Sequence, residues 1–417
     1  MTSATVDRAR LRELFDLRSS YNALTGGLYA GDPYPIWHDL RATGPVHEGT
    51  VHELTGHPGT LYFQGLPFPD RPHYSAFSYE ACFEAFRNPE VFASSSEPVD
   101  PVSGAYGHDN SMLTMGGEQH HRYRGLVQPS FLPNNAKWWI RNWIEECVHE
   151  LIEAFSSDGH AELNVDFCAA IPVLTITGSF GVPVEQALEI RACLNTDQAR
   201  VIEILAPIVA ARRSEPRDDL ISVLVQAELT DENGVTQWLS DNEIYSFSLL
   251  LLSAGSGTTW KQMGMTITAL LQRPDILDAV RQDRALVKAA IEETLRWTPT
   301  DPMFSRFVTE DIEFFGKEIP KGAVIHLCVG AANRDPERWE DPDVFDIYRK
   351  KRPTLAFGQG THMCLGMHVA RAEMTVGINA LLDALPNLRL DRAAEQPEFV
   401  GMYERGATAI PVLFDVT

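Results

Sequence analysis

A single long helical segment dominates the second half of the sequence. It opens with Ser240-Asp-Asn-Glu243, where a serine is followed three residues later by a glutamate, the capping-box pattern of a helix N-terminus. No proline follows before Pro274, so the helix can run for about 30 residues, or ~45 Å. A helix of that length crosses a whole globular domain, and we expect the rest of the chain to pack around it.

The middle of this segment contains two glycines, in Ala254-Gly255-Ser256-Gly257. A glycine inside a helix costs ~1 kcal/mol relative to alanine, so a compensating use is expected. Either the glycines let another helix approach closely, or they make room for a ligand. The stretch by itself leaves both interpretations open.

The remaining pattern predicts one large, mostly α domain over residues 1–417, with a minor β portion. No long polar linker and no internal repeat divides the 417 residues. From about residue 136 the chain is largely helical in pattern, for example over Trp138–Phe155, whereas the first 110 residues are richer in Gly, Pro and aromatic residues. Short strands are expected at Val46–Val51, Leu61–Phe63, Ile312–Phe315, Ala323–Cys328 and Ala409–Phe414.

Charge and cysteine usage exclude several classes of protein. The net charge of −22 argues against a nucleic-acid binder. The six cysteines show no paired spacing, so neither a disulfide framework nor a zinc site is expected, and a reducing compartment is favoured. The N-terminus lacks the apolar core of a signal peptide, and apolar runs such as Leu249–Leu252 are too short to span a bilayer. We therefore expect a cytoplasmic protein that does not enter the membrane.

A cysteine in a glycine-rich loop is the strongest chemical signal in the chain. Gly358, Gly360 and Gly366 surround Cys364, and a helical pattern follows directly. Glycines at this density suit a backbone that turns sharply and lets a bulky group approach. A thiolate just before a helix N-terminus is electrostatically favoured. The loop therefore predicts a thiolate that binds something large; a buried, inert cysteine is the alternative.

These residues together resemble the cytochrome P450 family. The stretch Phe357-Gly-Gln-Gly-Thr-His-Met-Cys364-Leu-Gly366 is similar to the family's haem-ligand loop. Four further signatures occur in the family's order: His120-His-Arg-Tyr-Arg124, Ala254-Gly-Ser-Gly-Thr-Thr259, Glu293-Thr-Leu-Arg296 and Pro342-Asp-Val-Phe-Asp-Ile-Tyr-Arg349. The resemblance covers most of the chain. It implies the P450 fold, a mostly helical triangular prism with a long central helix over the haem.

The resemblance also implies haem b as the cofactor, with Cys364 as the axial thiolate and metal ligand. A thiolate donates electron density to haem iron and favours O–O cleavage. Phe357 would shield the sulfur, while Gly358, Gly366 and Ala254 would lie against the porphyrin. Haem propionates need cationic partners when they are buried. By resemblance these are His120, Arg124, Arg306 and His362; the alternative for His120 and Arg124 is a solvated helix face.

Three charged residues have a structural role by resemblance. Glu293, Arg296 and Arg349 would form a buried ion network that fixes the side of the haem where the thiolate binds. Removal of one member would leave a buried charge without its partner, at a cost of ~3–5 kcal/mol. Loss of haem or of folding is the expected result.

The implied reaction is insertion of one oxygen atom from O2 into a substrate. Thr258 matches the family's threonine that hydrogen-bonds dioxygen, but the preceding position, usually acidic, is Gly257. Water positioned by Thr258, with help from Ser256 or Thr259, is therefore the expected proton route. A peroxide-driven enzyme, an O2-independent haem enzyme, and a haem sensor or carrier that does not turn over are the alternatives.

Electrons would come from a ferredoxin and a ferredoxin reductase that uses NAD(P)H, since no fused reductase domain is present. The cluster Arg349-Lys-Lys-Arg352 lies shortly before the cysteine loop and could steer an acidic ferredoxin. A solvated turn explains the cluster equally well.

The substrate expected from the resemblance is a moderately sized hydrophobic molecule, with a terpenoid or steroid-like skeleton favoured. The helices over the substrate channel should lie between Gly181-Val-Pro183 and Pro216-Arg-Asp-Asp219. Only 32 residues, 184–215, separate these two segments, fewer than the family usually has. An open pocket, a partner protein or missing residues would each explain that length. Asp301 is either a contact for a polar substrate group or an exposed loop acid. The expected pocket walls are the loop 93–112, Leu250, Ala254, Thr258, Met303, Phe304, Met402 and Tyr403.

Overall fold

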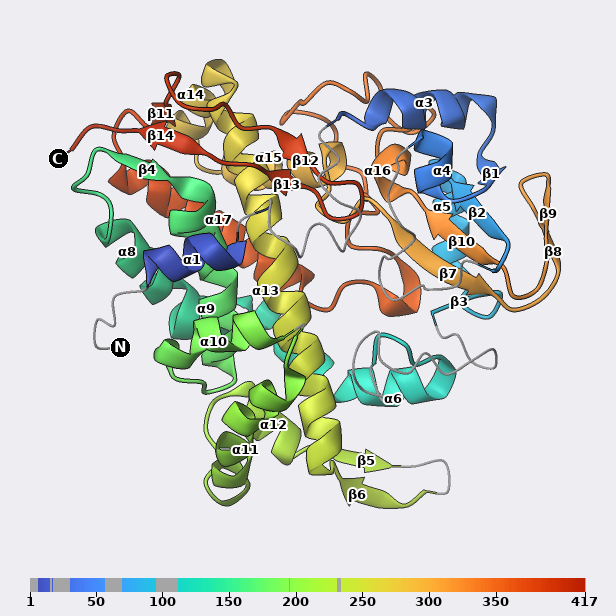
Figure 1. Ribbon diagram of the computed structural model, residues 1–417, viewed down its shortest axis with the longest axis horizontal. Helices are drawn as coiled ribbons and strands as arrows, with labels where there is room; N and C mark the ends of the chain where they lie inside the picture. The colour runs from blue at the N-terminus through green and yellow to red at the C-terminus, as the bar shows by residue number, and fades with distance from the viewer. Residues whose placement is uncertain are drawn as a thin grey trace.

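The computed structural model describes residues 7–15, 17, 31–56, 70–94, 112–194, 196–230 and 234–416. Helices make up most of it and lie mainly to one side of a small sheet (Figure 1). The α-helices are α1 Arg8–Phe15, α3 Tyr34–Thr43, α4 Val51–Thr55, α5 Tyr79–Arg87, α6 Gly117–Val127, α7 Ala136–Trp139, α8 Glu145–Glu153, α9 Ala170–Ser179, α10 Val184–Cys193, α11 Gln198–Ser214, α12 Leu220–Val225, α13 Asp241–Leu271, α14 Pro274–Gln282, α15 Leu286–Trp297, α16 Val329–Ala332 and α17 Met367–Ala384.

Short helical turns link several of these helices. Two stretches are π-helical, η3 Ile140–Ile144 and η4 Asn164–Ala169, and they continue into α8 and α9. The helix expected over Trp138–Phe155 is thus present, with one π-helical turn inside it. The remaining turns are the 3₁₀ segments η1 Gln128–Phe131, η2 Pro133–Asn135 and η5 Gly360–His362.

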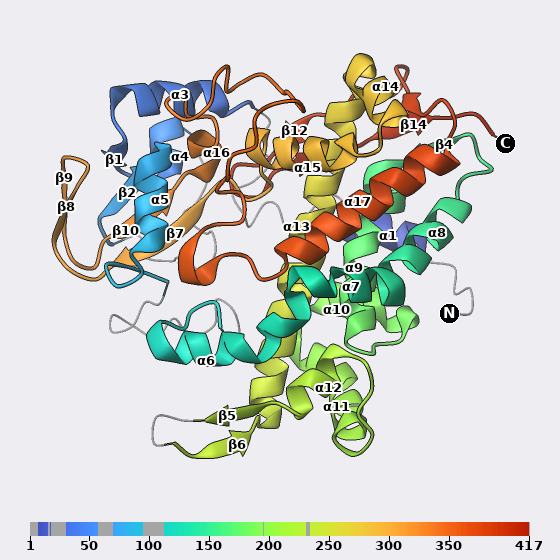
Figure 2. The same ribbon diagram turned by 180° about the vertical axis from the view of Figure 1, so that it is seen from behind.

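The predicted long helix is confirmed as α13. Ser240 accepts a hydrogen bond from the amide of Glu243, and the Glu243 carboxylate accepts one from the Ser240 amide, so the capping box is formed. The helix runs for 31 residues through the centre of the molecule in both views (Figures 1 and 2). It packs against η4 and α9 on one side and α15 and α17 on another. Helices α9, α15 and α17 are therefore positioned by their contacts with α13.

The strands form one larger sheet and several short pairs. The five-stranded sheet has the order β1-β2-β10-β7-β3, in which β10 pairs parallel to β2 and antiparallel to β7. Strands β8 and β9 form a hairpin beyond it. The strands are β1 Val46–Glu48, β2 His73–Ala76, β3 Phe92–Ala93, β4 His160–Glu162, β5 Glu228–Thr230, β6 Thr236–Trp238, β7 Phe304–Val308, β8 Ile312–Phe314, β9 Lys317–Ile319, β10 Val324–Leu327, β11 Arg389–Leu390, β12 Phe399–Val400, β13 Gly406–Ala407 and β14 Pro411–Leu413.

Four of the five expected strands are confirmed as β1, β8, β10 and β14, each slightly shorter than predicted. β1 ends early because Thr50 caps the helix that begins at Val51. The fifth expectation, Leu61–Phe63, lies outside the described residues. Strand β2 was not predicted: all four of its residues are buried, so it lacks the polar–apolar alternation that marks a half-exposed strand.

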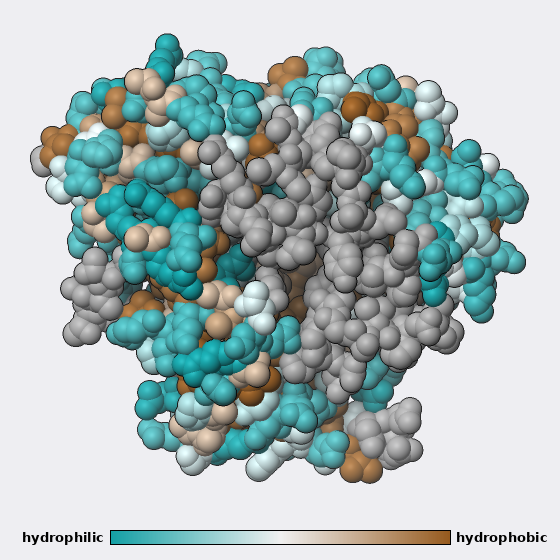
Figure 3. Space-filling model, viewed as in Figure 1, coloured by the Kyte–Doolittle hydropathy of each residue, from teal (hydrophilic) through white to brown (hydrophobic). Residues whose placement is uncertain are grey.

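The exterior agrees with the composition. On the face shown in Figure 3, hydrophilic residues cover most of the described surface. All six cysteines carry free thiols, as the spacing predicted. No single described helix is long and apolar enough to cross a membrane, although Asn164–Ser179 and Val184–Cys193, which meet at 105°, pass that test as a pair.

Candidate active site

The Cys364 loop folds as a tight turn ahead of α17. The Cys364 amide donates to the carbonyl of Phe357 at 2.9 Å, which closes the loop on itself. Burial raises the pKa of the Cys364 thiol; the backbone amide of Gly366 and the charges of Arg124 and Arg371 act in the opposite direction. The loop therefore supplies partners for a thiolate, although burial outweighs them.

The glycines of this loop serve two different purposes. Gly358 and Gly360 have φ values of +66° and +76°, which other residues rarely adopt. A Cβ on Gly360 would lie 2.4 Å from the carbonyl oxygen of Phe86, so this position also needs the space. No atom of the described residues lies within 4 Å of a Cβ built on Gly366. Two glycines thus shape the turn, and the third has no described neighbour at its Cβ position.

Cys364 and one face of α13 both carry open surface, and we call the region between them the recess. Burial raises the pKa of Cys364, yet part of this residue's surface is exposed, so it faces a space inside the protein. On α13, Leu250 and Thr258 are half-buried and Ala254 is exposed, whereas most other residues of this helix are buried. Their spacing of four residues places all three on one face. The segment from η5 to α17 runs toward the middle of α13 in both ribbon views (Figures 1 and 2).

The two glycines of the central helix differ in what lies beside them. A Cβ on Gly255 would lie 2.9 Å from Ile176 of α9, so this glycine permits close helix packing. A Cβ on Gly257 would meet no atom of the described residues within 4 Å. The close-packing interpretation therefore holds for Gly255, and the use of Gly257 to make room for a ligand stays a prediction.

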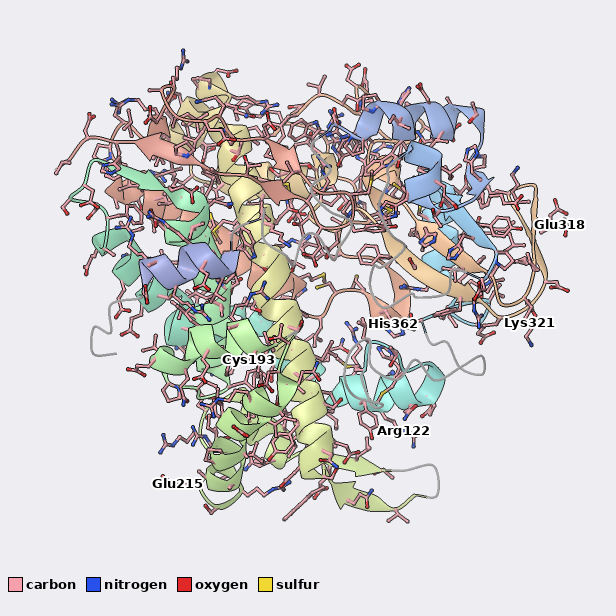
Figure 4. All side chains as sticks on the ribbon, viewed as in Figure 1. Arg122, Cys193, Glu215, Glu318, Lys321 and His362 are labelled. Atoms are coloured by element: carbon pink, nitrogen blue, oxygen red, sulfur yellow. The ribbon has the colours of Figure 1, made fainter. Side chains whose placement is uncertain are left out.

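The four expected propionate contacts come together from three parts of the chain. His120 and Arg124 lie on α6, His362 lies in η5 and Arg306 lies on β7. The rings of His120 and His362 stack with centroids 3.9 Å apart, and Arg124 donates to the carbonyl of Met363 at 2.6 Å. Figure 4 shows His362 between α6 and the sheet. Helix α6 is thus fixed against the cysteine loop, and a wholly solvated face is excluded for His120, which is 3% exposed.

This cationic cluster (His120, Arg124, Arg306 and His362) has no carboxylate counter-ion among the described residues. Burial lowers the pKa of His120 to about 4, of His362 to about 3 and of Arg306 to about 10, and no carboxylate in the described part of the chain opposes these shifts. The buried Nε2 of His120 has no hydrogen-bond partner. Two arginines and two imidazoles that burial keeps neutral, one of them with an unused buried ring nitrogen, are hydrogen-bond donors that fit an anionic ligand, and the two carboxylates of haem satisfy that requirement.

The expected ion network is formed. Arg296 makes two hydrogen bonds to the Glu293 carboxylate at 2.7 and 2.8 Å, and Arg349 donates to the same carboxylate at 3.3 Å. The Asp346 amide also donates to Glu293 at 2.9 Å. The side chains of Glu293 and Arg296 are 5% and 2% exposed. The network therefore joins α15 to the segment that leads into the cysteine loop.

The basic cluster is smaller than its sequence indicates. Arg349 turns inward to Glu293 and to backbone carbonyls, so its charge is not available at the surface. Lys350, Lys351 and Arg352 remain exposed. Any steering of an acidic partner here would depend on those three.

The polar residues of the central helix do not all face the recess. Thr258 is half-buried on the open face, whereas Ser256 is 1% exposed and donates to the Leu252 carbonyl at 2.7 Å. Arg191 of α10 also approaches the Ser256 oxygen at 3.4 Å. Thr259 is 7% exposed. Of the three hydroxyls, that of Thr258 is therefore best placed to meet a ligand in the recess.

Three of the expected pocket residues lie in the packed core. Met303, Met402 and Tyr403 belong to one buried cluster and are at most 2% exposed. Phe304 is half-buried and packs on Phe86 with ring centroids 5.6 Å apart. The loop 93–112 falls almost wholly outside the described residues. The recess is thus lined more clearly by α13 than by these segments, and the pocket assignments stay predictions.

Several residues of the site were not found from the sequence. Arg371, one turn into α17, lies over the Phe357 ring at 4.6 Å and pairs with Glu292. Phe86 packs against the glycine loop without any sequence signal. Lys261, a charged residue inside an apolar helix, pairs with Glu404; its unusual setting was the only available clue.

Comparison with known proteins places the chain in a family. The family model described as Cytochrome P450 matches residues 189–385. The polyketide biosynthesis cytochrome P450 PksS of Bacillus subtilis is 32% identical over 76% of this chain and 79% of its own. The cytochrome P450 monooxygenase PikC of Streptomyces venezuelae is 30% identical over 92% of this chain and 91% of its own.

The fold comparison agrees. The crystal structure of CYP109E1 from Bacillus megaterium with corticosterone matches with a TM-score of 0.78 and 25% identity, over 92% of this chain and 99% of that one. The expected mostly helical P450 fold is therefore confirmed. The chain belongs to the cytochrome P450 family, and it is a P450 monooxygenase.

Proposed function

We propose that this monooxygenase binds haem b through Cys364 and oxidises a moderately sized hydrophobic substrate, with electrons from a ferredoxin. The observation that carries the proposal is the cationic cluster beside Cys364: a thiol and an uncompensated set of basic groups share one recess. Haem is a ligand that offers iron to the thiolate and two carboxylates to the bases, and it supplies the chemistry of O2 activation.

Each residue then has a physical task. The Gly366 amide and the charges of Arg124 and Arg371 favour the thiolate form of Cys364, and the iron of the bound haem would outweigh the opposing effect of burial. His120, Arg124, Arg306 and His362 bind the two carboxylates. Phe357, covered by Arg371, keeps water from the sulfur. The Glu293 network holds the loop that carries the ligand.

Thr258 is proposed to hold a proton donor, either its own hydroxyl or a water, at the open face of α13. The neighbouring Gly257 carries no acid, so the proton has to arrive through water. The buried Ser256 hydroxyl already donates a hydrogen bond to the Leu252 carbonyl, so it is less available than the Thr258 hydroxyl to position a water. Thr258→Ala should therefore raise the O2 consumed per product formed, whereas Ser256→Ala should change that ratio little. An unchanged ratio in Thr258→Ala would contradict the relay.

A steroid-like or terpenoid skeleton is the proposed substrate class. The apolar stripe of Leu250 and Ala254 suits a compact hydrocarbon frame. A steroid is bound in the crystal structure of the relative CYP109E1, which is in complex with corticosterone, and this supports a steroid-like substrate for the present chain. A peroxide-driven reaction remains the alternative to the ferredoxin route.

The test is a titration of the purified ferric protein with steroids, terpenoids, fatty acids and small aromatics, read from the haem spectrum. A saturable shift to high-spin iron with one class shows that its members displace water from the iron. NADH-dependent O2 consumption with a surrogate ferredoxin system then follows for that class. Binding of fatty acids alone would refute the steroid-like skeleton, and turnover with peroxide alone would refute the ferredoxin route.

A further inference from the structure

Arg371 lies where the cysteine loop, the helix that follows it and helix α15 meet. It is the fifth residue of α17, so it lies ~6 Å along the axis from the helix start that follows Cys364. Its guanidinium lies over the ring of Phe357, 4.6 Å from the ring centroid. The Phe357 carbonyl accepts a hydrogen bond from the Cys364 amide at 2.9 Å. Arg371 therefore contacts a direct neighbour of the residue that carries the sulfur.

The guanidinium is fixed in this place by Glu292. Arg371 donates two hydrogen bonds to the two oxygens of the Glu292 carboxylate, from Nε at 2.5 Å and from Nη2 at 3.0 Å. This bidentate geometry sets the plane of the guanidinium. Glu292 lies on α15, which packs against α17, and the next residue, Glu293, accepts a hydrogen bond from the segment that leads into the loop. Two adjacent glutamates of α15 thus hold the chain before the cysteine loop and the helix after it.

The stability of the fold does not by itself account for this arrangement. The side chains of Arg371 and Glu292 are 31% and 39% exposed, and an ion pair with that exposure contributes little to stability. A cation over an aromatic ring at an exposed site also contributes little. The contacts instead keep a positive charge on the Phe357 ring, which shields the sulfur in the proposed haem complex.

A charge in this position bears on how readily the haem iron is reduced. Reduction by one electron adds one negative charge to a haem that has a thiolate ligand. A nearby cation stabilises that added charge, and a nearby anion opposes it. The surroundings of the axial ligand are among the means by which a protein sets the potential of its haem.

We propose that Arg371 is a positioning residue for electron transfer, which holds a positive charge on the Phe357 ring and thereby raises the reduction potential of the haem iron. The inference rests on the proposed function, because it requires haem bound through Cys364. Loss of the charge should favour ferric over ferrous iron by about 3–10-fold, equivalent to about 30–60 mV in a one-electron couple. The Glu292 carboxylate acts in the opposite direction and partly cancels the guanidinium.

The test is a spectroelectrochemical titration of the haem-loaded, substrate-free protein, with the haem content and spin state of each variant measured first. Arg371→Gln should lower the potential by about 30–60 mV, whereas Arg371→Lys, which keeps the charge, should stay within about 20 mV of the wild type. Glu292→Gln should raise the potential by at least about 20 mV, equivalent to about 2-fold. A glutamine at this position can still accept a hydrogen bond from Arg371, so the guanidinium stays in place.

The opposite signs expected for Arg371→Gln and Glu292→Gln separate an electrostatic role from a structural one. Both variants weaken the same ion pair, so a structural role would shift the potential in one direction. The matched control is Arg284→Gln, because Arg284 is 33% exposed and pairs with Asp383 near the other end of α17. That pair lies ~18 Å along the axis from Arg371, beyond the Debye length of ~8 Å at physiological salt. The control should leave the potential unchanged.

Several outcomes would overturn the inference. They are an unchanged potential in Arg371→Gln, a potential that falls in Glu292→Gln as well, and an Arg371→Lys variant that matches Arg371→Gln. Glu292→Gln breaks only a partly exposed pair, so its shift decides the question if Arg371→Gln does not retain haem. A wild type that binds no haem would refute the proposed function together with the inference. Unresponsive potentials in haem-loaded variants would refute the inference alone.

Discussion

Replacement of Gly360 by alanine tests whether the cysteine loop depends on close backbone approach. The residue has φ +76°, and a Cβ there would lie 2.4 Å from the Phe86 carbonyl oxygen. An ordinary contact begins near 3.4 Å, so the backbone of α5 or of the loop must move by about 1 Å. Overpacking of this kind costs ~1–3 kcal/mol. The left-handed conformation adds ~1–2 kcal/mol for alanine, partly offset by ~0.4–1 kcal/mol from the stiffer unfolded chain.

Gly316→Ala is the matched control. Gly316 has the same φ of +76° in the turn between β8 and β9, but nothing lies within 4 Å of its Cβ position. The conformational terms are therefore shared, and the difference between the two variants isolates the contact with Phe86. We expect Gly360→Ala to be less stable than Gly316→Ala by ~1–3 kcal/mol.

The assay is urea unfolding of the haem-loaded variants, followed by tryptophan fluorescence, with the haem content per protein measured beforehand. Gly360→Ala should also retain less haem, because the displaced loop carries Cys364. Equal stabilities within about 0.5 kcal/mol, with equal haem content, would refute the reasoning, since a contact of this kind is expected to cost at least twice that amount.

Two further predictions concern buried charge. Glu293→Gln should destabilise the protein by ~3–5 kcal/mol, because it leaves Arg296 and Arg349 without their shared carboxylate. The control is Glu292→Gln, which breaks a more exposed pair with Arg371. It should cost at most ~1 kcal/mol in the same urea experiment. Comparable losses in the two variants would contradict the assignment of the network. Burial lowers the pKa of His326 to about 3, with the nearby His73 and His52 adding to the shift, so the folded state holds this imidazole neutral. Its stabilising contribution is complete above the ordinary pKa of 6.5 and is lost as the pH falls below that value, by up to ~1.4 kcal/mol per pH unit. His326→Gln should flatten the decline in stability between pH 6.5 and 4, and an unaltered decline in thermal melting temperature would count against it.

The residues that act within one local segment could be read from the sequence. The capping box predicted where α13 begins, the absence of proline predicted how far it runs, and Glu293 with Arg296 occupies a single turn of α15. The glycines around Cys364 likewise indicated a tight loop before a helix. Local hydrogen bonds and backbone conformation are determined mainly by neighbouring residues, which explains these successes.

Contacts between distant segments were decided only by the tertiary structure. Gly255 and Gly257 look equivalent in sequence, yet only the first packs against Ile176. Arg349 belongs to a basic run, but Glu293, 56 residues away, draws it inward. Lys261 meets Glu404 across 143 residues. A side chain's environment depends on which elements pack beside it, and no local pattern records that. The sequence alone thus determined the long helix and the tight turn that carries Cys364. The tertiary structure decided which charges face the recess, because burial and partner geometry are properties of the packed chain.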